Sequence, residues 1–263
     1  MKRTAMIPAV LLATLVLGGC HVPDVARKTV TIEQEWPAAE IDTVDLRGHN
    51  GSVKIVAGTD DKINLEARVR SRHDNAEERI RKFVNPEIED GTLYIGERKS
   101  GRRRVVILPF FRAEDSAIAY VLTVPSRMNL QVTNVNGSMK IEGVSGTSAL
   151  RSVNGSIEVS TPGGQVTAKT VNGRVRADFM DEFRGAKLGT VNGSITVSLP
   201  PNASFRTDIS QVNGSFKSNV PMTVRSTSPI EGESEDLPSG TPQAKYPLEL
   251  TTVNGSVTVN QGG

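Results

Sequence analysis

The chain has 263 residues, of which 37% are hydrophobic and only 4% aromatic, which excludes a core built around large rings. It carries 31 Lys and Arg against 29 Asp and Glu, and this near balance gives no reason to expect a nucleic-acid partner. Cys20 is the only cysteine, which excludes a disulfide within one molecule.

Residues 1–19 have the pattern of a bacterial lipoprotein signal peptide. Lys2 and Arg3 give a positive start, and residues 5–17 are apolar but too short to span a membrane comfortably. The stretch ends in Leu-Gly-Gly-Cys, which resembles the lipobox, and the resemblance implies that Cys20 is lipidated (with palmitate among the acyl groups). We therefore expect residues 20–40 to be a lipid-anchored tether in the cell envelope, at the outer membrane or periplasmic face of a Gram-negative cell. A plain secretory leader followed by a free thiol is the alternative.

Residues 41–130 read as a β-rich N-terminal region with one short helix. Asp74 and the residues after it can cap a helix that runs to about Phe83, where Asn85-Pro86 ends it. Apolar residues alternate with polar ones in several short runs, which predicts strands at 29–33, 63–69, 92–95, 104–108 and 118–124. Residues 41–55 fit the repeat frame described below, with Val44 and Leu46 inward before Asn50. This region is either a set of coils interrupted by a helix or a small α+β cap over the first edge of the repeats. We favour the cap.

Residues 131–263 are organised by a repeated phrase, Val-Asn-Gly, usually followed by Ser, and a degraded copy lies near residue 50. The Asn residues from 136 onward are separated by 18, 18, 20, 21 and 41 positions, and the last step is about twice the unit. Such a period indicates a repeat architecture. The Asn-Gly pairs are Asn50-Gly51, Asn136-Gly137, Asn154-Gly155, Asn172-Gly173, Asn192-Gly193, Asn213-Gly214 and Asn254-Gly255.

The residues around each Asn alternate in polarity. The positions four before and three after it are apolar in every copy, and the position five after it is apolar in every copy except one, where it is Ser218. The position four after the Asn is polar in every copy. This period of two predicts two short strands per repeat, each with one buried face.

Two architectures fit these strands. Asn-Gly is a strong hairpin signal, so an antiparallel meander is one reading. Near-identical residues at one register favour the other, a parallel β-solenoid (β-helix) of about 18–21 residues per coil, in which the Asn side chains form a stacked row beside glycines that permit the bend. We favour the solenoid. The Asn-Gly-Ser sequon follows from this turn chemistry rather than from glycosylation.

Residues 219–246 interrupt the repeats with an acidic insertion. Pro221, Pro229, Pro238 and Pro242 break the strand pattern, and acidic residues cluster at 231–236. Leu248 and Leu250 resume the repeat frame. The last coil carries no evident polar cap, so we expect self-association through the C-terminal coil edge.

The repeats resemble those of a bacterial family of β-strand-repeat lipoproteins known as putative adhesins. The resemblance covers roughly residues 41–259 and rests on the segment IAYVLTVP at 118–125, the tandem TVNGS units and the closing LTTVNGSV at 250–257. It implies a β-solenoid on the cell envelope with an adhesive role, and it brings no catalytic residues.

The chain shows no catalytic set, metal-ligand cluster or cofactor motif, so we expect no enzyme activity, no metal and no cofactor. His21, His49 and His73 have no partners at ligand or triad spacing. Glu158 and Asp178 are the carboxylates to test if the chain acts on polysaccharides. One cluster of cations is a candidate contact patch for anionic headgroups or acidic glycans: Arg98, Lys99, Arg102, Arg103 and Arg104.

We therefore expect a non-enzymatic, lipid-anchored envelope protein that acts as an adhesin or surface scaffold. Its partners would be the membrane, through the N-terminal lipid, and an envelope glycan or protein. An envelope-stress sensor that binds a peptide or membrane protein through the acidic insertion is the alternative, and a polysaccharide-active enzyme is a third reading.

Overall fold

The computed structural model of the protein describes residues 28–58, 61–71, 84, 86–96, 117–220 and 246–262. These residues form strands and turns, which confirms the all-β class for this part of the chain. The strands are β1 (Lys28–Pro37), β2 (Thr43–Arg47), β3 (Val53–Gly58), β4 (Lys62–Ser71), β5 (Glu87–Glu89), β6 (Thr92–Gly96), β7 (Ala117–Pro125), β8 (Asn129–Asn136), β9 (Met139–Glu142), β10 (Ser148–Asn154), β11 (Ile157–Thr161), β12 (Val166–Asn172), β13 (Val175–Phe179), β14 (Ala186–Asn192), β15 (Ile195–Leu199), β16 (Phe205–Asn213), β17 (Phe216–Ser218), β18 (Tyr246–Asn254) and β19 (Val257–Gln261).

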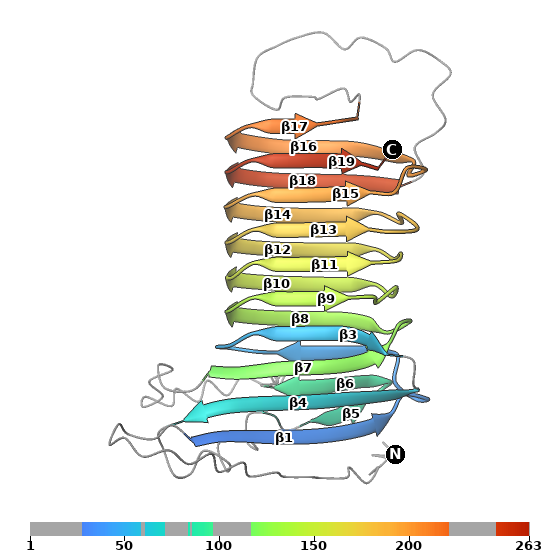
Figure 1. Ribbon diagram of the computed structural model, residues 1–263, viewed down its shortest axis with the longest axis vertical. Coiled ribbons are helices and arrows are strands. Elements are labelled where there is room, and N and C mark those ends of the chain that lie inside the picture. Colours follow the sequence, from blue (N-terminus) through green and yellow to red (C-terminus); the bar gives the residue numbers. More distant parts are fainter. Residues whose placement is uncertain are drawn as a thin grey trace.

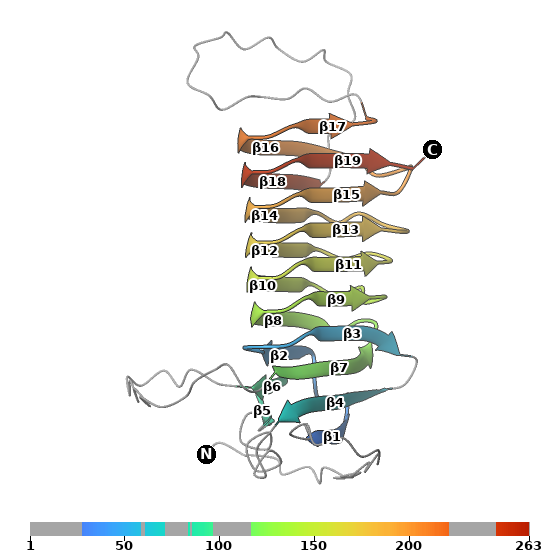
Figure 2. The same cartoon turned by 60° about the vertical axis from the view of Figure 1, so that its left-hand side comes forward.

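The described strands make two sheets that face each other along an elongated molecule (Figure 1). Sheet A has ten strands in the order β1-β4-β7-β3-β9-β11-β13-β15-β19-β17, and sheet B has nine in the order β16-β18-β14-β12-β10-β8-β2-β6-β5. Figure 2 shows the chain passing from one sheet to the other at a corner on one side of the stack. We use the word coil for one strand of sheet B, its Asn-Gly corner and the following strand of sheet A.

Successive coils pair in parallel, with equivalent residues at the same level. Asn154, for example, lies opposite Asn136 on one side and Asn172 on the other. The Asn-Gly corner thus joins strands of different sheets rather than two arms of a hairpin. The order of coils along the stack is β2/β3, β8/β9, β10/β11, β12/β13, β14/β15, β18/β19 and β16/β17.

The alternating residues form one continuous core between the sheets. The positions four before and three after each Asn are buried in every coil but the outermost, where Ile209 and Phe216 are half-buried. Each coil gains its second set of core contacts and its ladder hydrogen bonds from its neighbours. The coils are therefore expected to be stable only as a row.

The C-terminal coil is not at the end of the stack, contrary to the sequence-based expectation. β18 pairs with both β14 and β16, and β19 pairs with both β15 and β17. The chain thus places residues 246–261 between two coils that precede them in the sequence. Among the described strands, the free edge at this end belongs to β16 and β17.

The other end of the stack is antiparallel. β4 pairs antiparallel with β1 and β7, and β5 pairs antiparallel with β6. The strand expected at 29–33 is present and longer, because it spans Lys28–Pro37, and its Trp36 is buried in the core. The expected helix at 74–83 and strand at 104–108 lie outside the described residues. So do residues 1–27, which include the predicted signal peptide, and most of the acidic insertion.

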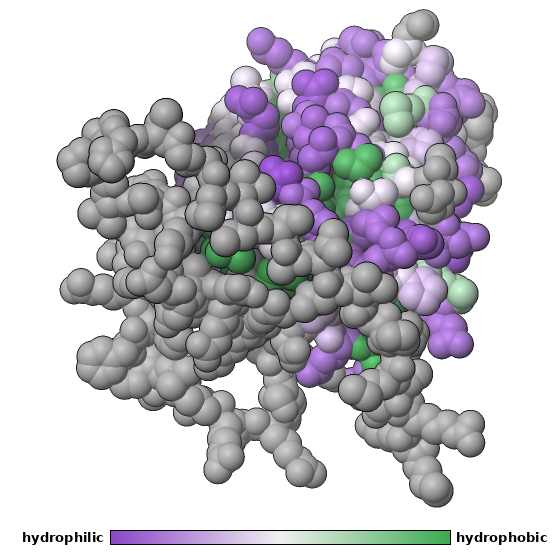
Figure 3. Space-filling model, turned by 60° about the horizontal axis from the view of Figure 1, so that its bottom comes forward, coloured by the Kyte–Doolittle hydropathy of each residue, from purple (hydrophilic) through white to green (hydrophobic). Residues whose placement is uncertain are grey.

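Polar residues cover most of the described surface visible from the β1 end of the stack (Figure 3). Apolar residues show there only in small, separate areas. In the part of the chain that the structure describes, there is no helix with the length and apolarity needed to cross a membrane.

Candidate functional site

The Asn side chains of the corners form one hydrogen-bonded ladder along the stack. The amide Nδ2 of Asn154 donates to Oδ1 of Asn136 at 2.9 Å, and Asn172 donates in the same way to Asn154 at 2.9 Å. Four further bonds extend the ladder to both sides, namely Asn136 to Asn50, Asn192 to Asn172, Asn254 to Asn192 and Asn213 to Asn254. Every corner of the stack is therefore tied to the next through its side chain as well as through its backbone.

The glycine after each Asn is required by the neighbouring coil. A Cβ placed on Gly155 would lie 2.0 Å from the carbonyl oxygen of Gly137, and one on Gly193 would lie 2.0 Å from that of Gly173. Gly137 and Gly173 also have positive φ values of 122° and 154°. Both the close approach of adjacent backbones and the bend at the corner thus favour glycine.

A second, inward-facing polar column supports the same corners, and sequence reasoning missed it. The hydroxyl of Thr170 donates to the carbonyl of Gly155, and that of Thr190 donates to Gly173, each at 3.0 Å. Asn134 and Gln211 bond the carbonyls of Gly51 and Gly255 in the same manner. The equivalent hydroxyls of Ser152 and Thr252 are buried without a partner. The sequence did carry a signal for this column. In every copy from Asn136 onward, a polar residue stands two positions before the corner Asn, and Asn134 is the first of these residues.

An exposed column of valines runs beside the Asn ladder on the outer surface. The valine before each Asn is 42% exposed at Val153 and 70% exposed at Val212. Val171, Val191 and Val253 belong to the same column. His49 takes this position in the first coil and is also exposed, as befits a corner residue. The valine and Asn columns thus present neutral side chains that repeat at the same level from coil to coil, and Arg174 is the cation beside them, where other described corners from Asn136 onward have Ser.

The outer face of sheet A carries paired charges. Lys140 and Lys54 both bond Glu142, at 2.8 and 3.3 Å, and Arg176 bonds Asp178 at 2.8 Å. The hydrogen bond from Lys140 lowers the pKa of the Glu142 carboxyl, and the bond to Asp178 raises the pKa of the Arg176 guanidinium.

The two carboxylates singled out for polysaccharide chemistry lie on this face among cations. Glu158 lies opposite Lys140 on one side and Arg176 on the other, while Asp178 is held by Arg176. A glycosidase uses two carboxyl groups that flank the bond to be cleaved. The structure places these two beside guanidinium and ammonium groups on a flat sheet face.

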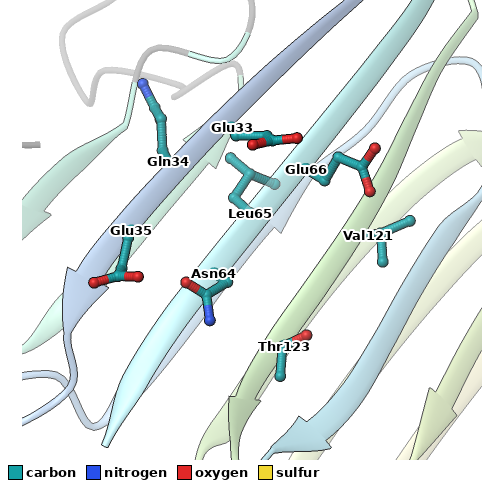
Figure 4. Close-up of a pocket in the computed structure, with 8 residues that line it drawn as sticks. All are labelled: Glu33, Gln34, Glu35, Asn64, Leu65, Glu66, Val121 and Thr123. Atoms are coloured by element: carbon teal, nitrogen blue, oxygen red, sulfur yellow. The ribbon is translucent and has the colours of Figure 1, made fainter. Parts of the chain in front are cut away.

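A shallow depression of about 470 Å³ lies on the outer face of the antiparallel end (Figure 4). Its rim consists of two rows across β1, β4 and β7: Glu33, Glu66 and Val121 in one, and Glu35, Asn64 and Thr123 in the other. Arg68 bonds Glu66, and Lys62 bonds Glu35 at 2.9 Å. Two of the three carboxylates at this depression are therefore already paired with cations.

The remaining sequence-based candidates lie outside the described residues. These are Cys20 and the cationic patch Arg98, Lys99, Arg102, Arg103 and Arg104. Within the described ranges, no group of three or more His, Cys, Asp or Glu side chains is arranged to hold a metal ion.

The fold and its corners define a protein of stacked β-coils with a hydrogen-bonded Asn edge. The family model described as Toastrack DUF4097 matches residues 27–260, and the chain belongs to that family. The resemblance drawn from the TVNGS units to a family of putative adhesins is confirmed.

The chain is also similar to solved structures from several bacteria. A putative cell adhesion protein from Clostridium sporogenes ATCC 15579 is 14% identical with a TM-score of 0.44, and the match covers 90% of this chain and 100% of that one. A putative adhesin from Bacteroides fragilis NCTC 9343 is 13% identical with a TM-score of 0.44, over 88% of this chain and 97% of that one. A putative adhesin from Parabacteroides merdae ATCC 43184 is 10% identical with a TM-score of 0.30, over 89% and 96%. No curated protein matches the chain.

Proposed function

We propose that the protein is a non-enzymatic β-solenoid stalk of the bacterial cell envelope, anchored by a lipid on Cys20, that acts in adhesion or surface scaffolding. The observation that carries the proposal is the placement of the two ends of the stack. β1, the strand nearest the proposed anchor in sequence, lies at one end, and the outermost coil β16/β17 lies at the other (Figure 1).

The construction between the ends suits a rigid spacer. The core is continuous over all described coils, and the corners are tied by the Asn ladder on the surface and by the polar column beneath it. With about 4.8 Å between neighbouring strands, six steps between seven coils separate the first and last corner by about 29 Å. A protein of this shape can present its far end away from the membrane in a fixed orientation.

The outer surface suits contact over an area rather than chemistry at a point. Equivalent side chains recur along the valine and Asn columns, and ion pairs neutralise much of the outer face of sheet A. Such a surface offers many similar weak contacts to a repetitive partner. An envelope glycan or an envelope protein are the partners that we propose for it.

The anchor and the adhesive role are tested together in cells. Cys20→Ala removes the proposed lipidation site without touching a described residue, so the chain should fold but leave the membrane fraction, and attachment of the cells should fall to the level of cells that lack the chain. Attachment that is the same with the wild-type chain, with Cys20→Ala and without the chain would contradict the proposal.

A separate assay addresses the enzymatic alternative. Purified chain should release no product from a panel of bacterial polysaccharides. Product release by the wild type that Glu158→Ala or Asp178→Ala abolishes, with the fold intact by circular dichroism, would contradict the proposal and indicate an enzyme.

A further inference from the structure

The outermost coil, β16/β17, leaves both sheets open at the end of the stack. Among the described strands, β16 pairs only with β18, and β17 pairs only with β19. Its inward residues Ile209 and Phe216 are half-buried, whereas Leu250 and Val257 at the equivalent positions of the next coil are fully buried. Phe205, also inward, is half-buried like its equivalent Tyr246. An edge strand with nine residues and partly exposed apolar side chains is a template for pairing with another strand.

Two charges on the outer face of β16 lack the ion pairs that similar charges form elsewhere. Arg176 and Asp178 are two residues apart on β13, and the Nε atom of Arg176 lies 2.8 Å from a carboxylate oxygen of Asp178. Arg47 with Asp45 and Lys140 with Glu142 have the same spacing and also form ion pairs. Arg206 and Asp208 have the same spacing, but among the described residues neither side chain has a hydrogen bond or ion pair. Asp208 lies beside Glu249, a like charge that is already paired with Lys187.

We propose that β16 pairs antiparallel with β16 of a second copy of the chain, which joins two stacks end to end about a two-fold axis. A two-fold axis at Thr207 sets Arg206 opposite Asp208 of the second copy, and Asp208 opposite its Arg206. It also sets Phe205 opposite Ile209 of the second copy on the inner face. Directly opposed residues of an antiparallel pair point to the same side, so both charge pairs lie outside and both apolar pairs lie inside.

The charges favour a second copy over an unrelated strand. A symmetric antiparallel pair requires one strand to be complementary to itself, and an Arg and an Asp on either side of a central residue satisfy that requirement. Each joint then forms two ion pairs from four charges that have no ion pair among the described residues of a single chain. The half-buried aromatic and aliphatic residues of the open coil are covered in the same step.

This end-to-end pairing also suggests how the chain could mediate adhesion. That consequence rests on the proposed function, whereas the pairing itself does not. If the β1 end is tethered to a membrane, the β16 end faces outward. Pairing of two such ends links chains from opposing surfaces, which is homophilic adhesion.

The test is a charge exchange measured by sedimentation velocity of the full chain over a range of concentrations. Wild-type protein should show a monomer–dimer equilibrium. Arg206→Asp and Asp208→Arg each turn two opposite-charge contacts into like-charge contacts, and each should weaken the dimer about thirtyfold. The double variant Arg206→Asp/Asp208→Arg restores opposite charges at both contacts and should recover most of the affinity. The same exchange at Arg176 and Asp178 in an inner coil is the matched control and should leave the dimer unchanged.

All four positions lie on outer faces, so each variant is expected to fold. Circular dichroism of each variant checks that it does. Amide hydrogen exchange of β16 should slow with concentration in the wild type and in the double exchange. A wild-type chain that is monomeric at every concentration, because its edge is covered by residues 221–245 or left free, would overturn the proposal. So would a dimer that the single exchanges do not weaken, or one that the double exchange does not restore.

Discussion

Replacing one corner glycine with alanine probes the contact on which the stack depends. The Cβ of Gly155→Ala would lie 2.0 Å from the carbonyl oxygen and 2.7 Å from the carbonyl carbon of Gly137, both of them backbone atoms. Because ordinary contacts begin near 3.4 Å, the two coils must separate by more than about an ångström at this corner. No side-chain rotation can relieve the overlap.

The expected cost follows from the bonds that flank this contact. The backbone N–H of Gly137 donates to the backbone carbonyl of Asn154 at 2.9 Å, and the backbone N–H of Met139 donates to that of Ser156 at 2.9 Å. The side-chain bond between Asn154 and Asn136 spans the same gap. At about 1 kcal/mol each, their loss lowers the free energy of unfolding by roughly 3 kcal/mol, less a few tenths for the lower entropy of the unfolded alanine chain.

The chain supplies its own control glycine. A Cβ on Gly163 would meet nothing nearer than the Cβ of Glu182 at 3.5 Å, which is an ordinary contact. Urea unfolding followed by circular dichroism should therefore place Gly163→Ala within about 1 kcal/mol of wild type and Gly155→Ala well below it. Equal stabilities of the two variants would refute the reasoning.

Three further predictions concern the ladder, a buried phenol and the repeat length. Asn172→Asp removes the hydrogen-bond donor to Asn154 and brings two oxygens face to face. It should lower the free energy of unfolding by about 1–2 kcal/mol at pH 7, measured by urea unfolding, and by less at pH 3, where a protonated carboxyl can donate. An equal loss at both pH values would contradict the ladder. Burial raises the pKa of Tyr120 to about 12 from 10.0, so the stability that its neutral form supplies below pH 10 is lost as the pH rises to 12, by at most about 3 kcal/mol. Tyr120→Phe should lack that part of the alkaline loss, and identical pH profiles would argue against its burial. Deleting residues 154–171 removes one whole coil in register and should leave a folded β-protein by circular dichroism, whereas deleting 154–162 removes half a coil and should prevent folding; similar behaviour of the two deletions would count against stacking.

The repeated core could be predicted because each copy carries the same local information. Leu150 and Ile157 flank Asn154 at positions that alternate with polar residues, and the same positions are buried in coil after coil. Near-identity between copies then favoured stacking over a meander. The exposure of His49 and the burial of Trp36 follow from the same alternation.

The order of the last two coils could not be predicted, because Phe216 and Val257 both fit the same slot in a coil. Parallel pairing depends on contacts distant in sequence, and the alternation within one coil says nothing about which coil lies beside it. A signal was nevertheless present. Thr207 and Ser218 occupy positions that are Leu248 and Val259 in the next coil, and polar residues at core positions are typical of a terminal repeat.

The antiparallel end shows the same limit. Alternation from Ile63 to Val69 predicted a strand, but the pairing of β4 with β1 and β7 joins segments about 30 and 50 residues away in opposite directions along the chain. The polar column of Thr170 and Thr190 was missed for a different reason. Threonine is common in strands, so a threonine near an Asn-Gly corner gives no sign of a special role. Its hydrogen bond depends on a backbone carbonyl of the neighbouring coil, which the sequence does not locate.

Two spin-label distances test the stacked arrangement most directly. Nitroxides on Ser52→Cys/Ser256→Cys and on Ser52→Cys/Ser215→Cys, in a Cys20→Ser background diluted with unlabelled chain, report how many coils separate the labelled corners. The structure places the corner of Ser256 five steps and that of Ser215 six steps from the first, which predicts about 24 Å and about 29 Å. A shorter distance to Ser215 than to Ser256, or distances that do not grow in strand-spacing steps, would contradict the arrangement.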